Sequence, residues 1–128
     1  MRLLLDTHIF LWFVSGNPKL ALALRGVISD PQNEIFLSVV SLWEIIIKNQ
    51  LGHLPLPHPP ELYVPIQRRR LRINSLAVDE GSVFQIAKLP PLHRDPFDRL
   101  LIGQAIEHNL KLVTVDTAIR AYPMAPVL

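Results

Sequence analysis

The sequence of 128 residues contains no cysteine. This absence excludes a disulfide framework and a thiolate metal site, so any bound metal has to be held by oxygen or imidazole ligands. A chain without cysteine also suits a reducing compartment. We therefore expect the protein to be cytoplasmic.

Long apolar runs are missing as well. The apolar stretch near the N-terminus, which extends to Val14, is interrupted by Asp6 and His8. No uninterrupted run approaches the roughly 18 residues of a membrane-spanning helix. A secretory signal would not carry these two polar residues inside its apolar region. We therefore expect no membrane association and assign this segment to the folded protein.

Charge is sparse and nearly balanced, with 13 Lys and Arg against 11 Asp and Glu. The formal net charge of +2 would suit an anionic partner without demanding one. Hydrophobic residues make up 49% of the chain, which is enough to bury a core in a chain of one-domain length. We predict a single domain that spans residues 1–128.

Short apolar runs alternate with helical patterns along the chain. Strands are predicted at 2–5, 34–39, 72–78 and 111–115, and helices at 8–14, 19–28, 42–51, 61–71, 80–88 and 96–108. Ser41, Asp79 and Asp95 should cap helices. Asn109 suits a left-handed helix stop, whereas Pro65 should kink or split its helix. The alternation predicts a three-layer α/β/α sandwich around a mostly parallel sheet.

Two of the apolar runs end in the same dipeptide. Asp6 and Thr7 follow the first predicted strand, and Asp116 and Thr117 follow the last. Open parallel sheets bind ligands at the carboxyl ends of their strands, so both aspartates could face one crevice. Each aspartate could instead simply cap the next helix, and the threonines could cap or add hydroxyl ligands.

Further acidic residues occur in two predicted helices. Glu44 lies in the apolar segment SLWEIIIK, where a lone carboxylate is costly unless it has a partner. The alternative for Glu44 is an ion pair with Lys48, four residues later. Asp98 lies in the segment DPFD, and its helix should bring it to the crevice beside Asp116. Asp95 and Asp98 also have the spacing of an acidic capping box.

Four carboxylates that converged on one crevice would repel one another by ~3 kcal/mol for each pair at ~5 Å. The candidates are Asp6, Glu44, Asp98 and Asp116. A hard divalent cation would remove this difficulty, and an all-oxygen site suits Mg²⁺ or Mn²⁺. The five histidines lack the paired spacing of a zinc motif. Such a cluster indicates phosphate chemistry, in which the metal activates a water molecule for in-line attack.

Basic residues could contact a long anionic substrate. Arg68, Arg69, Arg70 and Arg72 form one basic run, and Arg94 and Arg99 flank the acidic helix start. Contact with a nucleic-acid backbone is one interpretation of these residues. A solvated helix face is the alternative for the basic run.

Four segments carry a family resemblance. LLLDTHIFLW, SVVSLWEIIIK, HRDPFDRLLIGQA and LVTVD, in this order, resemble the PIN-domain family, and within it the toxin ribonucleases of VapC type. The third segment is the most specific, and the resemblance spans nearly the whole chain. It implies a Mg²⁺- or Mn²⁺-dependent endoribonuclease with an α/β/α sandwich. The implied acidic quartet falls on Asp6, Glu44, Asp98 and Asp116, with Asp95 as a fifth carboxylate and Thr117 beside the last aspartate.

The resemblance also implies protein partners. Such toxins form homodimers and are held inactive by a cognate antitoxin, part of which inserts into the active-site groove. The apolar residues Leu11, Trp12, Phe13 and Trp43 are candidate surface for such a partner, with plain core packing as the alternative.

Other classes of protein fit less well. A phosphoacceptor receiver domain needs adjacent acids after its first strand, and Asp6 stands alone there. A haloacid-dehalogenase-type phosphatase would carry an aspartate where this chain has His8. A non-catalytic binding module with a PIN-like fold stays open as an alternative to the nuclease.

Overall fold

The computed structural model describes residues 1–92 and 95–128. Its elements are β1 (Arg2–Leu5), α1 (Thr7–Ser15), α2 (Leu22–Ser29), β2 (Glu34–Ser38), α3 (Val39–Gln50), α4 (Pro60–Arg70), β3 (Ile73–Leu76), α5 (Glu80–Ile86), α6 (Pro96–Glu107), β4 (Lys111–Val113) and α7 (Thr117–Arg120). Strands and helices alternate as predicted. None of the described helices is long and apolar enough to cross a membrane.

The described strands form one parallel sheet in the order β3-β2-β1-β4. At the centre, Leu4 of β1 lies opposite Phe36 of β2 and Leu112 of β4. From β1 the chain adds β2 and β3 on one side of the sheet and then crosses over to add β4 on the other side of β1. The order in which strands are added therefore reverses between β1 and β4, while all four strands stay parallel. The carboxyl ends of such neighbouring strands are where parallel sheets bind ligands.

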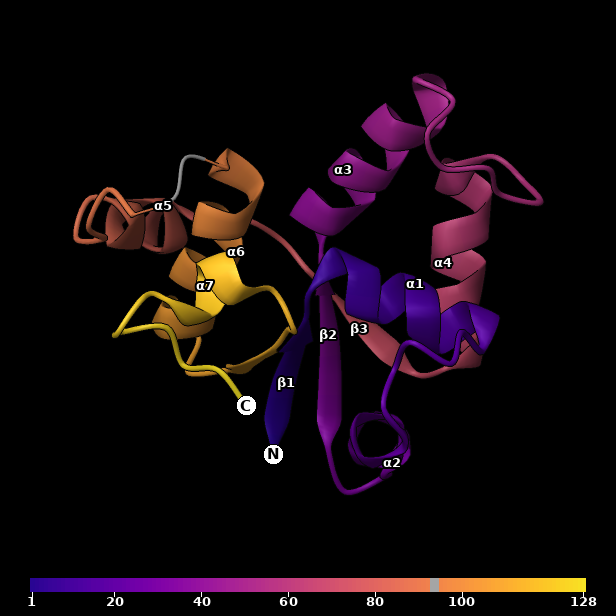
Figure 1. The fold of residues 1–128 in the computed structure, drawn as a ribbon, viewed down its shortest axis with the longest axis horizontal. Coiled ribbons are helices and arrows are strands. Elements are labelled where there is room, and N and C mark those ends of the chain that lie inside the picture. Colours follow the sequence, from indigo (N-terminus) through magenta and orange to yellow (C-terminus); the bar gives the residue numbers. More distant parts are fainter. Residues whose placement is uncertain (93–94) are drawn as a thin grey trace.

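Helices cover both faces of the sheet, which confirms the predicted α/β/α class. Successive strand residues point to opposite faces. Leu3 and Leu5 belong to a core cluster with residues of α1 to α4, whereas Leu4 packs against α6 and α7 in a second cluster. In Figure 1, α1, α2 and α4 lie on one side of β1 and β2, and α5, α6 and α7 lie on the other.

Helix α3 begins earlier than predicted, which corrects the role of Ser41. Ser38 is the N-cap, because its backbone is extended and its hydroxyl accepts a hydrogen bond from the Val40 amide at 3.0 Å. Val39 and Val40 resemble a continuing strand, since β-branched residues favour strands. Ser41 therefore lies inside the helix, fully buried, on the face that carries Glu44.

The other predicted caps are confirmed, and of the two effects predicted for Pro65, a kink or a split, the structure excludes the split. Asp79 and Asp95 cap α5 and α6, and Asn109 has a left-handed φ of 55°. Pro65 does not split its helix, because α4 is continuous from Pro60 to Arg70. A proline removes one helical hydrogen bond, from the carbonyl four residues earlier. That residue is Glu61, which is exposed, so water can replace the lost partner.

Candidate active site

Asp6 lies at the point where β1 ends, and it is both a cap and a buried acid. It is 6% exposed. Its Oδ1 accepts a hydrogen bond from the Thr7 amide, and its Oδ2 accepts one from the Thr114 hydroxyl, both at 2.8 Å. Burial raises the pKa of Asp6, and the nearby charge of Glu44 raises it further, against the opposing effect of the hydrogen bonds. The carboxylate is thus oriented by two donors while its charge remains poorly compensated.

Glu44 is joined to this carboxylate through Thr7. The Thr7 hydroxyl lies 2.7 Å from Glu44 Oε1 and 2.9 Å from the Ser41 hydroxyl. Because a hydroxyl carries one proton, Thr7 donates to Glu44 and accepts from Ser41. The other carboxylate oxygen of Glu44 pairs with Lys48 Nζ at 2.8 Å. The predicted ion pair is therefore present, and Glu44 is nevertheless 9% exposed and fixed beside Asp6.

Asp116 is connected to the same network through Thr114. The Thr114 hydroxyl, which donates to Asp6, accepts a hydrogen bond from the Asp116 amide at 3.0 Å. Asp116 is half-buried, and its Oδ1 caps α7 by accepting a hydrogen bond from the Ala118 amide at 2.8 Å. Thr117, the first residue of α7, is exposed. A single hydroxyl thus joins the loop after β4 to the end of β1.

Asp98 lies in the first turn of α6 and is 8% exposed. The Asp95 carboxylate caps this turn, with Oδ1 2.9 Å from the Phe97 amide nitrogen. The Phe97 and Trp43 rings form a T-shaped contact at a centroid distance of 4.9 Å. Since Trp43 precedes Glu44 and Phe97 precedes Asp98, this contact brings the start of α6 beside the acidic turn of α3.

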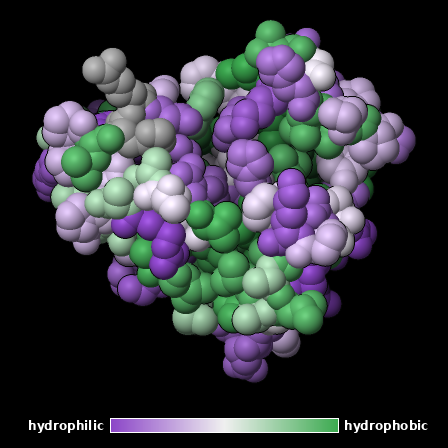
Figure 2. Space-filling view, viewed as in Figure 1, coloured by the Kyte–Doolittle hydropathy of each residue, from purple (hydrophilic) through white to green (hydrophobic). Residues whose placement is uncertain are grey.

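The four predicted carboxylates therefore belong to elements that meet at one edge of the sheet. Figure 2 shows a hollow between the α6 side and the α3 side of the molecule, bordered by hydrophilic side chains. Three of the four acids, Asp6, Glu44 and Asp116, are joined by hydrogen bonds through two threonines. Asp98 reaches this edge through the contact of α6 with α3.

The donor chemistry of these acids suits a hard divalent cation, which prefers several carboxylate oxygens. Their side chains are turned to protein donors instead, as shown by the Glu44–Lys48 pair and the Asp116 cap. Within residues 1–92 and 95–128, no three His, Cys, Asp or Glu side chains form a group that could hold a metal ion. Shared metal binding by the quartet stays a prediction, and so does a role for Asp95, whose observed contact is the helix cap.

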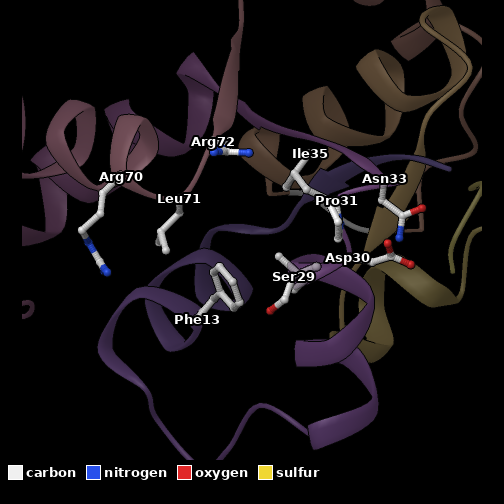
Figure 3. A pocket seen from close by; sticks show the side chains of 10 residues that line it. Phe13, Ser29, Asp30, Pro31, Asn33, Ile35, Arg70, Leu71 and Arg72 are labelled. Atoms are coloured by element: carbon white, nitrogen blue, oxygen red, sulfur yellow. The ribbon is translucent and has the colours of Figure 1, made fainter.

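The basic run lies at the other edge of the sheet. Arg68, Arg69 and Arg70 end α4, three to five residues before β3 begins, and parallel strands all begin at the edge opposite their carboxyl ends. Figure 3 shows Arg70 and Arg72 lining a pocket of about 370 Å³, which Asp30 and Phe13 also line. The structure therefore does not bring the basic run beside the acids, and RNA binding by these arginines stays a prediction.

Of the two basic residues predicted to flank the acidic start of α6, the structure describes one, Arg99. Arg94 lies outside the described residues. The Arg99 guanidinium donates hydrogen bonds to the Tyr122 hydroxyl at 2.8 Å and to the Pro90 carbonyl at 3.0 Å. Arg99 therefore ties α6 to the segments around it, and its predicted contact with RNA remains untested.

Two site residues were missed by the sequence analysis. Thr114 lies within an apolar run, where a β-branched residue indicates only a strand. The sequence signal for Thr114 is its position two residues before Asp116. A hydroxyl at this spacing can accept a hydrogen bond from the backbone amide of the aspartate. Ser41 was interpreted as a cap, although it stands three residues before Glu44 and so shares its helix face.

Comparisons with known proteins agree with this architecture. A family model described as PIN domain matches residues 3–123, and the chain belongs to this family. Ribonuclease VapC16 of Mycobacterium tuberculosis is 46% identical over 57 residues, which span 44% of this chain and 40% of that protein. Ribonuclease VapC22 of the same organism is 25% identical over 120 residues, or 93% of this chain and 90% of that protein.

The fold is also found in a solved structure. VapBC2 from Rickettsia felis, bound to a DNA fragment from its promoter, superposes with a TM-score of 0.75. The match covers 100% of this chain and 98% of that chain at 18% sequence identity. At this identity the likeness establishes the fold, and it confirms the α/β sandwich predicted from the sequence.

Proposed function

We propose that the protein is an endoribonuclease that hydrolyses RNA phosphodiester bonds with the help of Mg²⁺ or Mn²⁺. The observation that carries this proposal is the hydrogen-bonded series in which Thr114 joins Asp116 to Asp6 and Thr7 joins Asp6 to Glu44. Membership of the PIN domain family and similarity to two ribonucleases support it.

The proposed metal ligands are Asp6, Glu44, Asp98 and Asp116. Three of them, Asp6, Glu44 and Asp98, are less than 10% exposed, and charged carboxylates at such a place need positive charge nearby, of which Lys48 supplies one to Glu44. A bound divalent cation would supply Lewis acidity toward a phosphate oxygen and lower the pKa of a bound water. Thr7 and Thr114 keep Asp6 and Glu44 in place, since their hydroxyl protons are already committed to the two carboxylates.

Metal removal tests the proposal directly. We expect the purified protein to cut RNA in Mg²⁺ or Mn²⁺, to lose this activity in excess EDTA, and to recover it when either metal is restored. The matched control is Glu61→Gln, which removes an exposed acid of α4 and should cut RNA in Mg²⁺ as fast as the unaltered protein. The measurement is cleavage of 5′-labelled structured RNAs on a denaturing gel. Equal cleavage with and without EDTA would rule out the proposed metal dependence.

We further propose that the protein is the toxin of a toxin-antitoxin pair, acts on RNA in the cytoplasm to arrest translation, and forms a homodimer. The support is the likeness to solved complexes described as VapBC, such as the one from Rickettsia felis. Coexpression with a cognate antitoxin should give a complex that purifies intact and cuts RNA at least about tenfold more slowly than the free protein. Light scattering of the free protein should give twice the 14.6 kDa chain mass. A monomer, or full activity in the complex, would contradict these two assignments.

A further inference from the structure

Lys48 supplies positive charge beside the acidic network. Its Nζ lies 2.8 Å from Oε2 of Glu44, which precedes it by one helical turn on α3. Among the described residues, no other Lys or Arg forms an ion pair with Asp6, Glu44 or Asp116. Glu44 is thus the one member of this hydrogen-bonded trio that has a cation of its own in the part of the chain that the structure describes.

The two donors to Glu44 differ in how easily they can leave it. Thr7, which donates to Oε1, is 1% exposed and is the first residue of α1, so it cannot withdraw without that helix. The Lys48 side chain is 36% exposed and ends in a flexible four-carbon stem. Its ammonium can move into water while the stem keeps its apolar contacts. Lys48 is therefore the partner that Glu44 can exchange.

A divalent cation suits this place better than an ammonium in one respect. The Lys48 ammonium pairs with a single acid, whereas a hard divalent cation can share the oxygens of several carboxylates. Asp6 lies beside Glu44 through Thr7 and has only hydroxyl and amide donors as partners. Both oxygens of Glu44 are already engaged by protein donors, so a metal ion that used Oε2 would take the place of the ammonium.

We propose that Lys48 is a built-in counterion of Glu44 that a divalent cation displaces when it binds at the acidic site. This inference rests on the proposed function and adds a means of regulating the same site. Only molecules in which the ammonium has left Glu44 offer that oxygen to the metal. The apparent affinity is therefore lower than the intrinsic affinity in proportion to the fraction of such molecules. Lys48 sets the concentration of Mg²⁺ or Mn²⁺ at which the site fills.

The first test measures Mn²⁺ binding by electron paramagnetic resonance of the free ion. In Lys48→Met, which keeps the apolar stem and removes the charge, we expect the Kd for Mn²⁺ to fall by about 5- to 50-fold. Lys48→Arg keeps a charged donor and should bind Mn²⁺ no more tightly than the unaltered protein. The matched control is Lys111→Met, which removes an exposed lysine from the start of β4 and should leave the Kd within about twofold.

Salt separates displacement of Lys48 from a general effect of charge. At 0.5 M NaCl the Debye length is about 4 Å, so an effect of net charge on Mn²⁺ binding would largely disappear. The tighter binding of Lys48→Met should persist at this salt concentration, because the ion pair is a direct contact beside a buried acid. Loss of the difference between Lys48→Met and the unaltered protein would overturn the inference.

The second test follows the lysine in the unaltered protein. In protein labelled with ¹³C at lysine Cε, the Lys48 resonance is identified by its absence from Lys48→Arg. At saturating Mg²⁺ it should move toward the resonance of exposed lysines such as Lys111. A Lys48 resonance that stays where it was in EDTA would show that the ammonium remains on Glu44, and it would overturn the inference.

The outcomes also separate this inference from the function on which it rests. If the unaltered protein cuts RNA and Lys48→Met binds Mn²⁺ with an unchanged Kd, the inference is overturned and the nuclease proposal stands. If Lys48→Met binds Mn²⁺ more tightly and the unaltered protein cuts no RNA with any metal, the inference stands and the proposed function fails. If no divalent cation binds to either protein, the inference and the proposed metal dependence fail together.

Discussion

In the variant Asp6→Asn, RNA cleavage should fall by at least about 10³-fold while the fold is retained. The substitution replaces one carboxylate oxygen by an NH₂ group, and the resulting neutral amide is a poor ligand for a hard cation that prefers anionic oxygen. A loss of this size corresponds to about 4 kcal/mol in the free energy of the transition state. The measurement is single-turnover cleavage with enzyme in excess over labelled RNA.

The fold of this variant should be preserved for a specific reason. Asparagine can still accept the Thr7 amide, so the cap of α1 remains. Burial raises the pKa of Asp6, and a carboxyl whose pKa is higher in the folded than in the unfolded protein favours folding only at low pH. That contribution is lost as the pH rises through the folded-state pKa. At neutral pH and without metal, Asp6→Asn should therefore melt no lower than the unaltered protein.

Asp30→Asn is the matched control, because Asp30 is an exposed aspartate at the opposite edge of the sheet, where it lines the pocket near Arg72. We expect its cleavage rate to stay within about twofold of the unaltered protein. Equal activity in Asp6→Asn and Asp30→Asn would mean that Asp6 takes no part in the chemistry. A lower melting temperature in metal-free Asp6→Asn would instead show that the Asp6 charge stabilises the fold.

In Gly103→Ala, the free energy of unfolding should fall by about 2–3 kcal/mol. Gly103 is buried in α6, where this helix packs against α5. A Cβ added there would lie 2.4 Å from the backbone carbonyl oxygen of Ser82. Because the obstructing atom belongs to the backbone of α5, the two helices have to move apart. Urea denaturation followed by circular dichroism measures the loss.

The control for this substitution is Gly26→Ala. Gly26 lies within α2, and a Cβ added there would meet nothing within 4 Å beyond its chain neighbours and the nearby backbone of its own helix. Alanine in a helix interior is favoured over glycine by roughly 0.5–1 kcal/mol, so this variant should be slightly more stable than the unaltered protein. Equal free energies of unfolding for the two alanine variants would show that α5 does not pack against Gly103 as closely as described.

Much of the fold could be predicted because local signals agreed with tertiary structure. The strand at Arg2–Leu5 was predicted with its exact bounds, because the apolar run that predicts a buried strand ends where Asp6 follows it. The start of α3 could not be predicted, because Ser38 and Ser41 are both good caps and the valines between them favour a strand. Both serines are buried in the fold, and only the packing of the helix on the sheet decides which of them caps it.

The candidate site was predicted in part for a similar reason. The positions of Asp6 and Asp116 follow from the rule that parallel strands end at one edge, and the hydrogen bonds through Thr114 bear out their proximity. The arginine run was associated with the acids through its charge alone. Its place directly before β3, near Arg72, assigns it to the opposite edge, and this topological argument was available from the sequence.

The central claim is that acids from four separate elements share a divalent cation at the carboxyl edge of the sheet. An anomalous difference map from a crystal grown with Mn²⁺ tests it most directly. We expect a peak coordinated by Asp6 together with at least two of Glu44, Asp98 and Asp116, with Lys48 displaced from Glu44. A map with no peak at this edge at saturating Mn²⁺, or with the ion bound elsewhere, would contradict it.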